Sequence, residues 1–365
     1  MYNVFFKKGR RPVPLVALKE VTMDTGSVRV AIAQASPVYL DRDATVDKAC
    51  RLIEDAGAQG ASLVAFPEGF VPGHPLWYHF HAATGPVSRE LATRLYRNAV
   101  VIPGPETEAL GAAAARAQCH VMIGVCERAS AHAGTLYNSQ VLIGPDGRVL
   151  NVHRKLTPTV GERLVHAPGD ASGLRVVDTA IGRISGLICG ESSNPLAVFT
   201  LIAESTQIHV ISWPDFPGRG MLSRAERALV ASRGLAFMSK AYILNAIGVL
   251  SDEMRTILRS SSDDDPFLDD LTLTGGSSVV GPDGNVVAGP VDHTEQLLIA
   301  DLDLGACLHE KTVHDFAGHY NRSDVFTLHV DRSRREIFVP GGDTSVRTAI
   351  GADVLNGAEA GSREG

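Results

Sequence analysis

Short apolar runs alternate along the chain with longer segments in which apolar residues recur every three or four positions. The apolar runs are typical of buried strands and lie at 28–36, 61–66, 119–128, 136–144, 148–155, 182–189, 207–214, 241–250 and 275–289. The segments with helical spacing lie at 43–57, 88–100, 105–118, 193–205 and 221–238. Strands that alternate with helices predict an α/β fold in which helices cover sheets.

Two segments share one turn sequence. Pro-Asp-Gly lies within 143–150 and again within 280–287, each time between apolar stretches. This tripeptide is a strong turn signal, so both segments predict β-hairpins. The sequence similarity between the two segments favours two sheets of related architecture.

The domain limits follow from periodicity and composition. No change of composition within 28–330 marks a linker, which predicts one domain over that range. Residues 1–27 lack periodicity and read as an N-terminal extension, whose basic residues follow an apolar stretch in the wrong order for a secretory signal. Residues 331–365 read as a partly disordered tail, and the Ser- and Asp-rich segment 251–271 as a partly mobile surface loop.

The overall composition narrows the class of protein. The chain has 365 residues, of which 44% are hydrophobic, and a formal net charge of −7, which argues against a nucleic-acid binder. No run reaches the roughly 18 apolar residues that a membrane span needs. The 5 cysteines are widely spaced without a Cys-x-x-Cys motif, so we expect no disulfide framework and a cytoplasmic location.

Three chemically active side chains each stand at the end of a predicted strand. Glu68 lies in VAFPEGF, Lys155 in NVHRKLTPT and Cys189 in GLICGESSNPL. A structural cysteine is usually buried in an apolar stretch, so a thiol in a small, polar turn is a candidate nucleophile. A lysine ammonium stabilises a developing anion, and a carboxylate in an apolar wall can carry protons. We expect the three residues to meet at one edge of the sheet.

This combination resembles the nitrilase superfamily of carbon–nitrogen hydrolases. The matching stretches, between about residue 28 and residue 328, are FPEGFVPGHP, HRKLTPTVGER, CGESSNPL, HVISWP, GGSSVVGPDG and DFAGHYNRSDVF. Of these, HRKLTPTVGER and GHYNRSDVF are most similar to the nitrilase branch. The resemblance implies a four-layer α–β–β–α sandwich and no metal or organic cofactor. It also implies a homo-oligomer, a dimer or a larger assembly that can extend into a spiral.

The resemblance also implies an activity and a role for each residue. A nitrilase hydrolyses a small organic nitrile to the carboxylic acid and ammonia. Cys189 would attack the nitrile carbon, Glu68 would move the proton, and Lys155 would hold the developing negative charge. Glu162 resembles a second carboxylate that orients Lys155 or water, although it could also be a surface residue paired with Arg163.

The chain departs from the nitrilase pattern directly after the cysteine. Nitrilases commonly carry Cys-Trp-Glu, whereas this chain has Cys189, Gly190 and Glu191. The departure keeps open an amidase or carbamoyl hydrolase of the same superfamily. A non-catalytic assembly protein that kept the fold is a third reading, which the intact set of three residues disfavours.

Several further residues are candidates for substrate binding. We predict that the pocket is formed by Trp77, Trp213, Gly190 and Glu191, with the amide of Gly190 in the oxyanion site. Other aromatic or imidazole side chains follow Glu68 and either line the pocket or build an aromatic core: Phe70, Tyr78, Phe80 and His81.

Two other kinds of site find little support. The spacings among His74, His79 and His81 fit no common ligand motif, and His309 and His314 are one residue too far apart for the HExxH zinc motif. We therefore predict no metal site. Ser277 has no accompanying Ser-Lys arrangement, which a serine-dependent amidase would need.

Overall fold

The computed structural model of the chain describes residues 27–216, 222–259 and 266–333. The predicted N-terminal extension, except for its last residue, and the predicted tail from residue 334 lie outside the described residues. The description below concerns the unit that ends at Arg332.

Two sheets of six strands form the centre of the unit. The first sheet has the order β12-β1-β2-β3-β4-β5, and the second has the order β11-β10-β9-β8-β7-β6. The strands of the first sheet are β1 (Val28–Gln34), β2 (Leu63–Ala65), β3 (His120–Arg128), β4 (Leu136–Ile143), β5 (Val149–Arg154) and β12 (Gln296–Leu302). Those of the second are β6 (Val177–Thr179), β7 (Gly182–Ile188), β8 (Ile208–Trp213), β9 (Tyr242–Ile247), β10 (Ser278–Val280) and β11 (Val286–Ala288).

Alternation within the strands explains why the two sheets stack. In β1, Val30 and Ile32 pack against the second sheet, together with Ile208 and Val210 of β8. The intervening Ala31 of β1 instead packs with helix residues in a separate cluster. Since successive side chains of a strand point to opposite faces, each sheet buries both of its faces.

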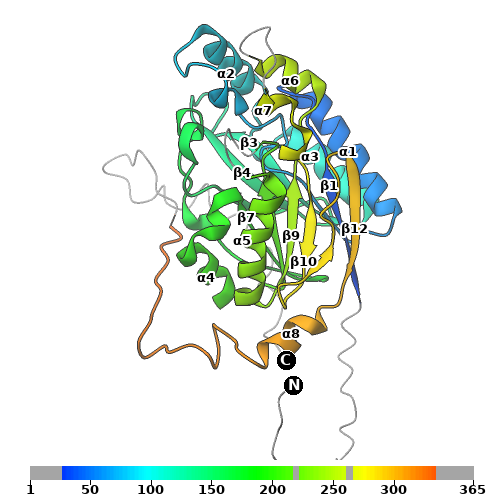
Figure 1. Cartoon of the computed structure of the whole chain (residues 1–365), viewed down its shortest axis with the longest axis vertical. Coiled ribbons are helices and arrows are strands. Elements are labelled where there is room, and N and C mark those ends of the chain that lie inside the picture. The colour runs from blue at the N-terminus through cyan, green and yellow to red at the C-terminus, as the bar shows by residue number, and fades with distance from the viewer. Residues whose placement is uncertain (1–26, 217–221, 260–265, 334–365) are drawn as a thin grey trace, which may run out of the picture. The chain divides into compact units, whose positions relative to one another are not determined.

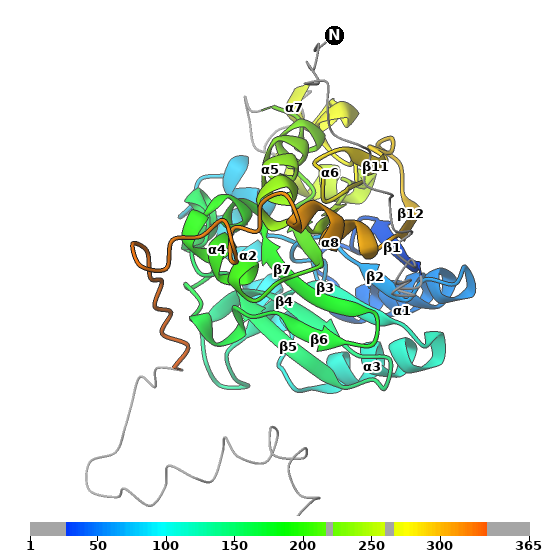
Figure 2. The same cartoon turned by 90° about the horizontal axis from the view of Figure 1, so that it is seen from below.

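Helices cover the two outer faces, as Figures 1 and 2 show. α1 (Arg42–Ala58) and α3 (Pro105–Ala117) pack on the first sheet, and α4 (Pro195–Ala203) and α5 (Arg224–Ser239) pack on the second. The result is the four-layer α–β–β–α sandwich that the resemblance implies. None of the helices that the structure describes has the length and apolar character needed to cross a bilayer.

The predicted helices and hairpins are confirmed to within a few residues. The side chain of Asp41 caps α1 by accepting a hydrogen bond from the amide of Ala44 at 3.0 Å. Both Pro-Asp-Gly turns join antiparallel neighbours, β4 to β5 in the first sheet and β10 to β11 in the second.

The prediction of a surface loop over 251–271 is wrong for most of its described part. Ser251 caps α6 (Asp252–Leu258), and α7 (Pro266–Asp269) follows the gap at 260–265, which lies outside the described residues. Met254, Leu258 and Leu268 are fully buried in a cluster with residues that follow β2. Three apolar anchors therefore fold a segment whose average composition is that of a loop.

The remaining helices are short or lie at the ends of the strands. They are α2 (Pro86–Asn98), α8 (Gly305–Lys311) and the 3-10 turns η1 (Leu76–His79), η2 (Val160–Leu164), η3 (Ala171–Gly173), η4 (Cys189–Ser193) and η5 (Leu271–Leu273). After α8, the chain runs beside α4, where Arg332 forms an ion pair with Glu204.

Candidate active site

A buried lysine joins two buried carboxylates at the ends of the first sheet. Nζ of Lys155 lies 2.6 Å from Oε1 of Glu68 and 2.8 Å from Oε2 of Glu162. All three side chains are at most 1% exposed. Glu162 is therefore not a surface residue paired with Arg163, and a buried cation holds two buried anions in place.

Local structure explains how each of these side chains reaches the site. Glu68 follows β2, and its amide donates a hydrogen bond to the carbonyl of Trp213 in the second sheet. Lys155 follows β5 directly. Glu162 lies in η2, where its carboxylate accepts a hydrogen bond from the amide of Thr159 at 2.8 Å and so caps the turn.

Cys189 comes from the other sheet, which corrects the expectation of a single sheet edge. It is the first residue of η4, directly after β7, and its φ of 54° lies in the left-handed region. That conformation costs a non-glycine residue about 1–2 kcal/mol. The site thus forms where the ends of the two stacked sheets face each other, and a strained turn presents the thiol.

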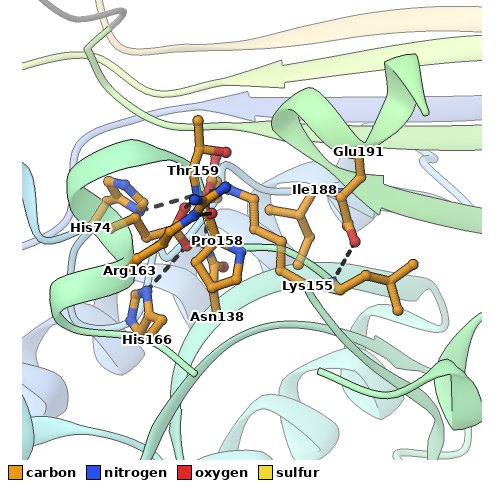
Figure 3. A network of polar contacts seen from close by, with 12 residues as sticks. His74, Asn138, Lys155, Pro158, Thr159, Arg163, His166, Ile188 and Glu191 are labelled. Carbon is orange, nitrogen blue, oxygen red and sulfur yellow. Dashed lines mark hydrogen bonds and ion pairs between the residues drawn. The ribbon is translucent and has the colours of Figure 1, made fainter. Parts of the chain in front are cut away.

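Asn138 links the two carboxylates a second time. Its Nδ2 donates to Oε1 of Glu68 and to Oε1 of Glu162, both at 2.7 Å. His166 lies on the far side of Glu162, with Nδ1 at 3.2 Å from Oε1. Figure 3 shows this network, with His74 and His166 on one side and Glu191 on the other. Oε2 of Glu68 is buried without a hydrogen-bond partner in the structure, so one carboxylate oxygen remains free to accept a proton.

The pKa values of Glu68, Glu162 and Lys155 are shifted in different ways, which distinguishes the three residues chemically. Burial raises the pKa of Glu68, against the opposing effect of Lys155. Burial also favours the neutral form of Glu162, but Lys155 and His166 outweigh it and hold the pKa of Glu162 far below its ordinary value. For Lys155, burial lowers the pKa, and the neighbouring carboxylates and Cys189 together raise it well above its ordinary value. Glu162 and Lys155 are therefore charged, and Glu68 is the carboxylate with proton-carrier chemistry.

The thiol of Cys189 is protonated at rest. Burial and the nearby Glu68 raise its pKa to about 11, against the opposing effects of Lys155 and Arg224. A thiol in this state needs a base that removes its proton as it attacks.

A pocket of about 720 Å³ opens onto this site. Of the residues predicted from the sequence, its walls include Glu68, Lys155, Glu162, Cys189, Gly190, Trp213 and Tyr78. A Cβ at Gly190 would meet no atom within 4 Å, so glycine leaves that part of the wall open. Nε1 of Trp213 donates to Oδ1 of Asn245 at 3.0 Å, which fixes the indole in the wall.

The structure does not bring all of the predicted binding residues into the pocket. Trp77 is 2% exposed and packs in a core cluster with Leu76 and Phe80, and Phe70 packs in the core between the first sheet and its helices. η1 is a single turn, so the neighbouring Tyr78 points to the pocket while Trp77 points away from it. His81 is also absent from the described lining.

Glu191 is a second correction, because its carboxylate points away from the pocket. Oε2 accepts hydrogen bonds from Nε2 of His153 and the amide of Ile188, both at 3.0 Å, and Oε1 accepts one from the amide of Leu156 at 2.6 Å. Glu191 thereby ties the turn of Cys189 to the residues on either side of Lys155.

Sequence reasoning missed several residues of the site. Asn138 lies inside the predicted strand 136–144. Its only signal in the sequence is a polar amide side chain within a strand that is expected to be buried. His74, which the sequence offers only as a potential metal ligand, lines the pocket, and burial lowers the pKa of its imidazole to about 3, so it is neutral. Arg224 and Arg227 lie at the start of α5 and also line the pocket.

One group of side chains among the described residues could supply metal ligands, and it differs from the histidine sets that the sequence disfavours. Glu68, His74 and Glu162 place one potential ligand atom each within 4.8 Å of one another. The ammonium of Lys155 already donates to both carboxylates, so a metal ion there would face a cation at close range. The hydroxyl of Ser277 binds the backbone of Ile247 and lies outside the described pocket lining.

Comparison with known proteins shows the family of the chain. The sequence model of the carbon–nitrogen hydrolase family matches residues 29–308. The chain is 40% identical to nitrilase 2 of an unidentified prokaryote, over 85% of this chain and 94% of that protein. It is 36% identical to an arylacetonitrilase of Aspergillus kawachii, over 85% and 93% of the two chains. With a nitrilase of a Bacillus species it shares 32% identity over 91% and 96%.

Solved structures show the same fold at lower sequence identity. The carbon–nitrogen hydrolase of Helicobacter pylori aligns with a TM-score of 0.61 and 20% identity, covering 82% of this chain and 97% of that one. A yeast Nit3 protein, a member of the nitrilase superfamily, aligns with a TM-score of 0.59 and 18% identity, over 80% and 96%. The chain therefore belongs to the carbon–nitrogen hydrolase family, in its nitrilase branch.

Proposed function

We propose that this protein is a nitrilase, which hydrolyses an organic nitrile to the carboxylic acid and ammonia with Glu68, Lys155 and Cys189 as its catalytic residues. The observation that carries the proposal is the arrangement of Glu68. Lys155 and Asn138 hold Oε1, while Oε2 has no hydrogen-bond partner, and Glu68 and Cys189 line the same pocket. The nitrilases among its relatives supply the substrate class.

The proposed reaction begins with attack of Sγ of Cys189 on the nitrile carbon. The thiol proton passes to Glu68 and then to the nitrile nitrogen, which gives a thioimidate. Lys155 stabilises negative charge on the nitrogen, and the amide of Gly190 contributes to the same site. The raised pKa of Glu68 suits this proton transfer, because it makes the carboxylate a stronger base towards the thiol of Cys189.

Two molecules of water complete the reaction. The first adds its oxygen to the thioimidate carbon, with Glu68 as the base. Both protons of this water pass to the nitrogen, so that ammonia leaves and a thioester remains. The second hydrolyses the resulting thioester to the acid and restores the thiol of Cys189. Glu162 orients Lys155 throughout, which their 2.8 Å contact supports.

An amidase would use the same three residues, and Gly190 is the departure from the nitrilase pattern that favours it. A Cβ at this position would meet only open space, so the glycine widens the pocket without altering the groups that do the chemistry. The named relatives favour the nitrilase over the amidase or carbamoyl hydrolase.

The test is ammonia release from aliphatic, arylaliphatic and aromatic nitriles beside the corresponding amides. Wild type should release ammonia from at least one nitrile class, faster than from the matched amide. Turnover of amides alone would overturn the proposal in favour of an amidase. Cys50→Ala, which removes another free and half-buried thiol outside the pocket, is the control for Cys189→Ala.

We also propose a homo-oligomer in a reducing, cytoplasmic compartment. Exposed apolar side chains on α4 and α5, namely Leu196, Phe237 and Met238, support an interface between copies. All five cysteines are unpaired, which supports the reducing compartment. Light scattering coupled to size exclusion tests the oligomer, and a monomeric mass would contradict it.

A further inference from the structure

The pocket carries positive charge that the proposed chemistry does not use. Its described lining contains the carboxylates Glu68 and Glu162 and the cations Lys155, Arg224 and Arg227. Even with His74 and His79 left out of the count, two negative charges and three positive charges leave one positive charge in excess. Lys155 is already engaged by both carboxylates, so the excess lies with the two arginines of α5.

Arg224 is a buried cation without an ion-pair partner among the described residues. It is 5% exposed, and its guanidinium lies 5.5 Å from the centre of the Trp213 ring. Nη2 donates to the carbonyl of Phe216, but the buried Nε has no acceptor. A contact with an indole offsets only part of the cost of burying a charge, so the site is incomplete without an anion.

Arg227 lies one turn further along the same face of α5. Its Nε is buried without an acceptor, and no ion pair joins its side chain to any residue within the described parts of the chain. Both side chains are presented near the N-terminus of a 16-residue helix, whose dipole adds to their attraction for an anion. A planar guanidinium binds a carboxylate through two parallel hydrogen bonds, which a single charge on a lysine could not reproduce.

The rest of the pocket is suited to a flat apolar body. Trp213, Phe216 and Tyr78 line the same cavity of about 720 Å³ as the catalytic residues and the two arginines. Aromatic walls bury an aryl ring, and convergent polar groups then fix its orientation.

We infer that the preferred substrate is a nitrile that also bears a carboxylate, and that Arg227 and Arg224 bind this carboxylate. The inference rests on the proposed function for its reaction, but the anion site itself can be tested by binding alone. An aryl ring between the carboxylate and the nitrile fits the aromatic walls.

The test compares 3- and 4-(cyanomethyl)benzoate with the matching neutral tolylacetonitriles. In wild type, kcat/KM should be higher for an acid than for its neutral partner, and the ratio should fall as ionic strength rises. Arg227→Gln should lower this ratio by roughly 10- to 100-fold, as expected for the loss of a charge-assisted hydrogen-bond pair. Arg227→Glu should reverse the preference towards (aminomethyl)phenylacetonitriles.

The control is Arg233→Gln, on the same helix but outside the described pocket lining. Nε of Arg233 binds the carbonyl of Gly284, and its loss should leave the ratio unchanged. If Arg227→Gln slows the acid and the neutral nitriles equally, the arginines act on the reacting groups and the inference is wrong, while the nitrilase assignment stands.

Calorimetric binding of the same cyanomethylbenzoates to Cys189→Ala separates the two proposals. Binding that weakens in Cys189→Ala/Arg227→Gln supports the anion site even if wild type hydrolyses no nitrile. Equal affinity in both proteins would overturn the inference whatever the activity.

Discussion

Glu191, which follows a strand of the second sheet, accepts a hydrogen bond at 3.0 Å from Nε2 of His153 in a strand of the first sheet. Both side chains are almost completely buried. The contact fastens the turn that carries Cys189 to the strand that ends at Lys155. The spacing of nucleophile and cation therefore depends on a residue whose carboxylate faces away from the pocket.

This relationship predicts a loss of both stability and activity in Glu191→Gln. In either orientation of the glutamine amide, its NH2 group would face the backbone N–H of Leu156 or of Ile188. Two donors would then meet without an acceptor. We expect the free energy of unfolding to fall by about 1–3 kcal/mol. We also expect kcat to fall more than KM rises, because Cys189 and Lys155 would no longer be held at the correct distance from each other. Thermal unfolding and ammonia release measure the two effects, with the exposed Glu108→Gln in α3 as the control.

Asn138 should matter to catalysis although it cannot itself carry a proton. Asn138→Ala removes a donor from Glu68 and from Glu162 and leaves both buried oxygens with one partner fewer. We expect kcat to fall roughly 10- to 100-fold. Asn151→Ala in β5, which breaks one hydrogen bond to Gly173, is the matched control and should retain wild-type kcat. Equal kcat in the two variants would contradict the role of Asn138.

Removal of the proton carrier and of the nucleophile should give different kinetic signatures. Glu68→Gln keeps an oxygen for Lys155 but cannot take the thiol proton, so kcat should fall by about 10²–10⁴-fold. Cys189→Ala should abolish turnover to the detection limit, because no thioimidate can form. Pre-steady-state ammonia release distinguishes them, and a Glu68→Gln enzyme with wild-type kcat would refute the assignment.

The pH dependence of kcat/KM follows from the pKa shifts. Glu68 must be ionised to accept a proton, and burial raises its pKa above 4.5, so activity should rise with pH through a value above the ordinary glutamate range. Activity should fall again as the Cys189 thiol, with its pKa of about 11, loses the proton that the mechanism delivers to nitrogen. A flat profile from mildly acidic to alkaline pH would contradict this account.

Glu162 gives this profile a second test. Its negative charge raises the pKa of Glu68, so Glu162→Gln should move the acidic limb to lower pH while it lowers kcat. A shift to higher pH would mean that the loss of Lys155 orientation outweighs the removed charge.

Much of the fold could be read from the sequence because its strands bury both faces. Continuous apolar runs and periodic helices gave the α/β layers, and the position of Glu68, Lys155 and Cys189 after strands followed from the same pattern. The sequence could not reveal that Cys189 belongs to the opposite sheet, since local periodicity carries no information on which strands pair.

The wrong predictions for individual residues also have local structural reasons. Trp77 and Tyr78 lie side by side in a one-turn helix, and no periodicity in so short a segment tells which of them faces the core. The position of Glu191 two residues after Cys189 predicts a binding residue, whereas the turn directs its carboxylate at backbone amides. Arg224 and Arg227 look like solvent-facing positions of an ordinary helix until the pocket against α5 is seen.

The most direct test of the central claim is the mass of the enzyme during turnover. Wild type mixed with an arylacetonitrile and quenched in acid within the first turnover should carry a thioimidate or acyl adduct, and peptide mapping should place it on Cys189. Glu68→Gln should accumulate less adduct, and Cys50→Ala should behave as wild type. Ammonia release without any adduct on Cys189, or an adduct that persists in Cys189→Ala, would contradict the account.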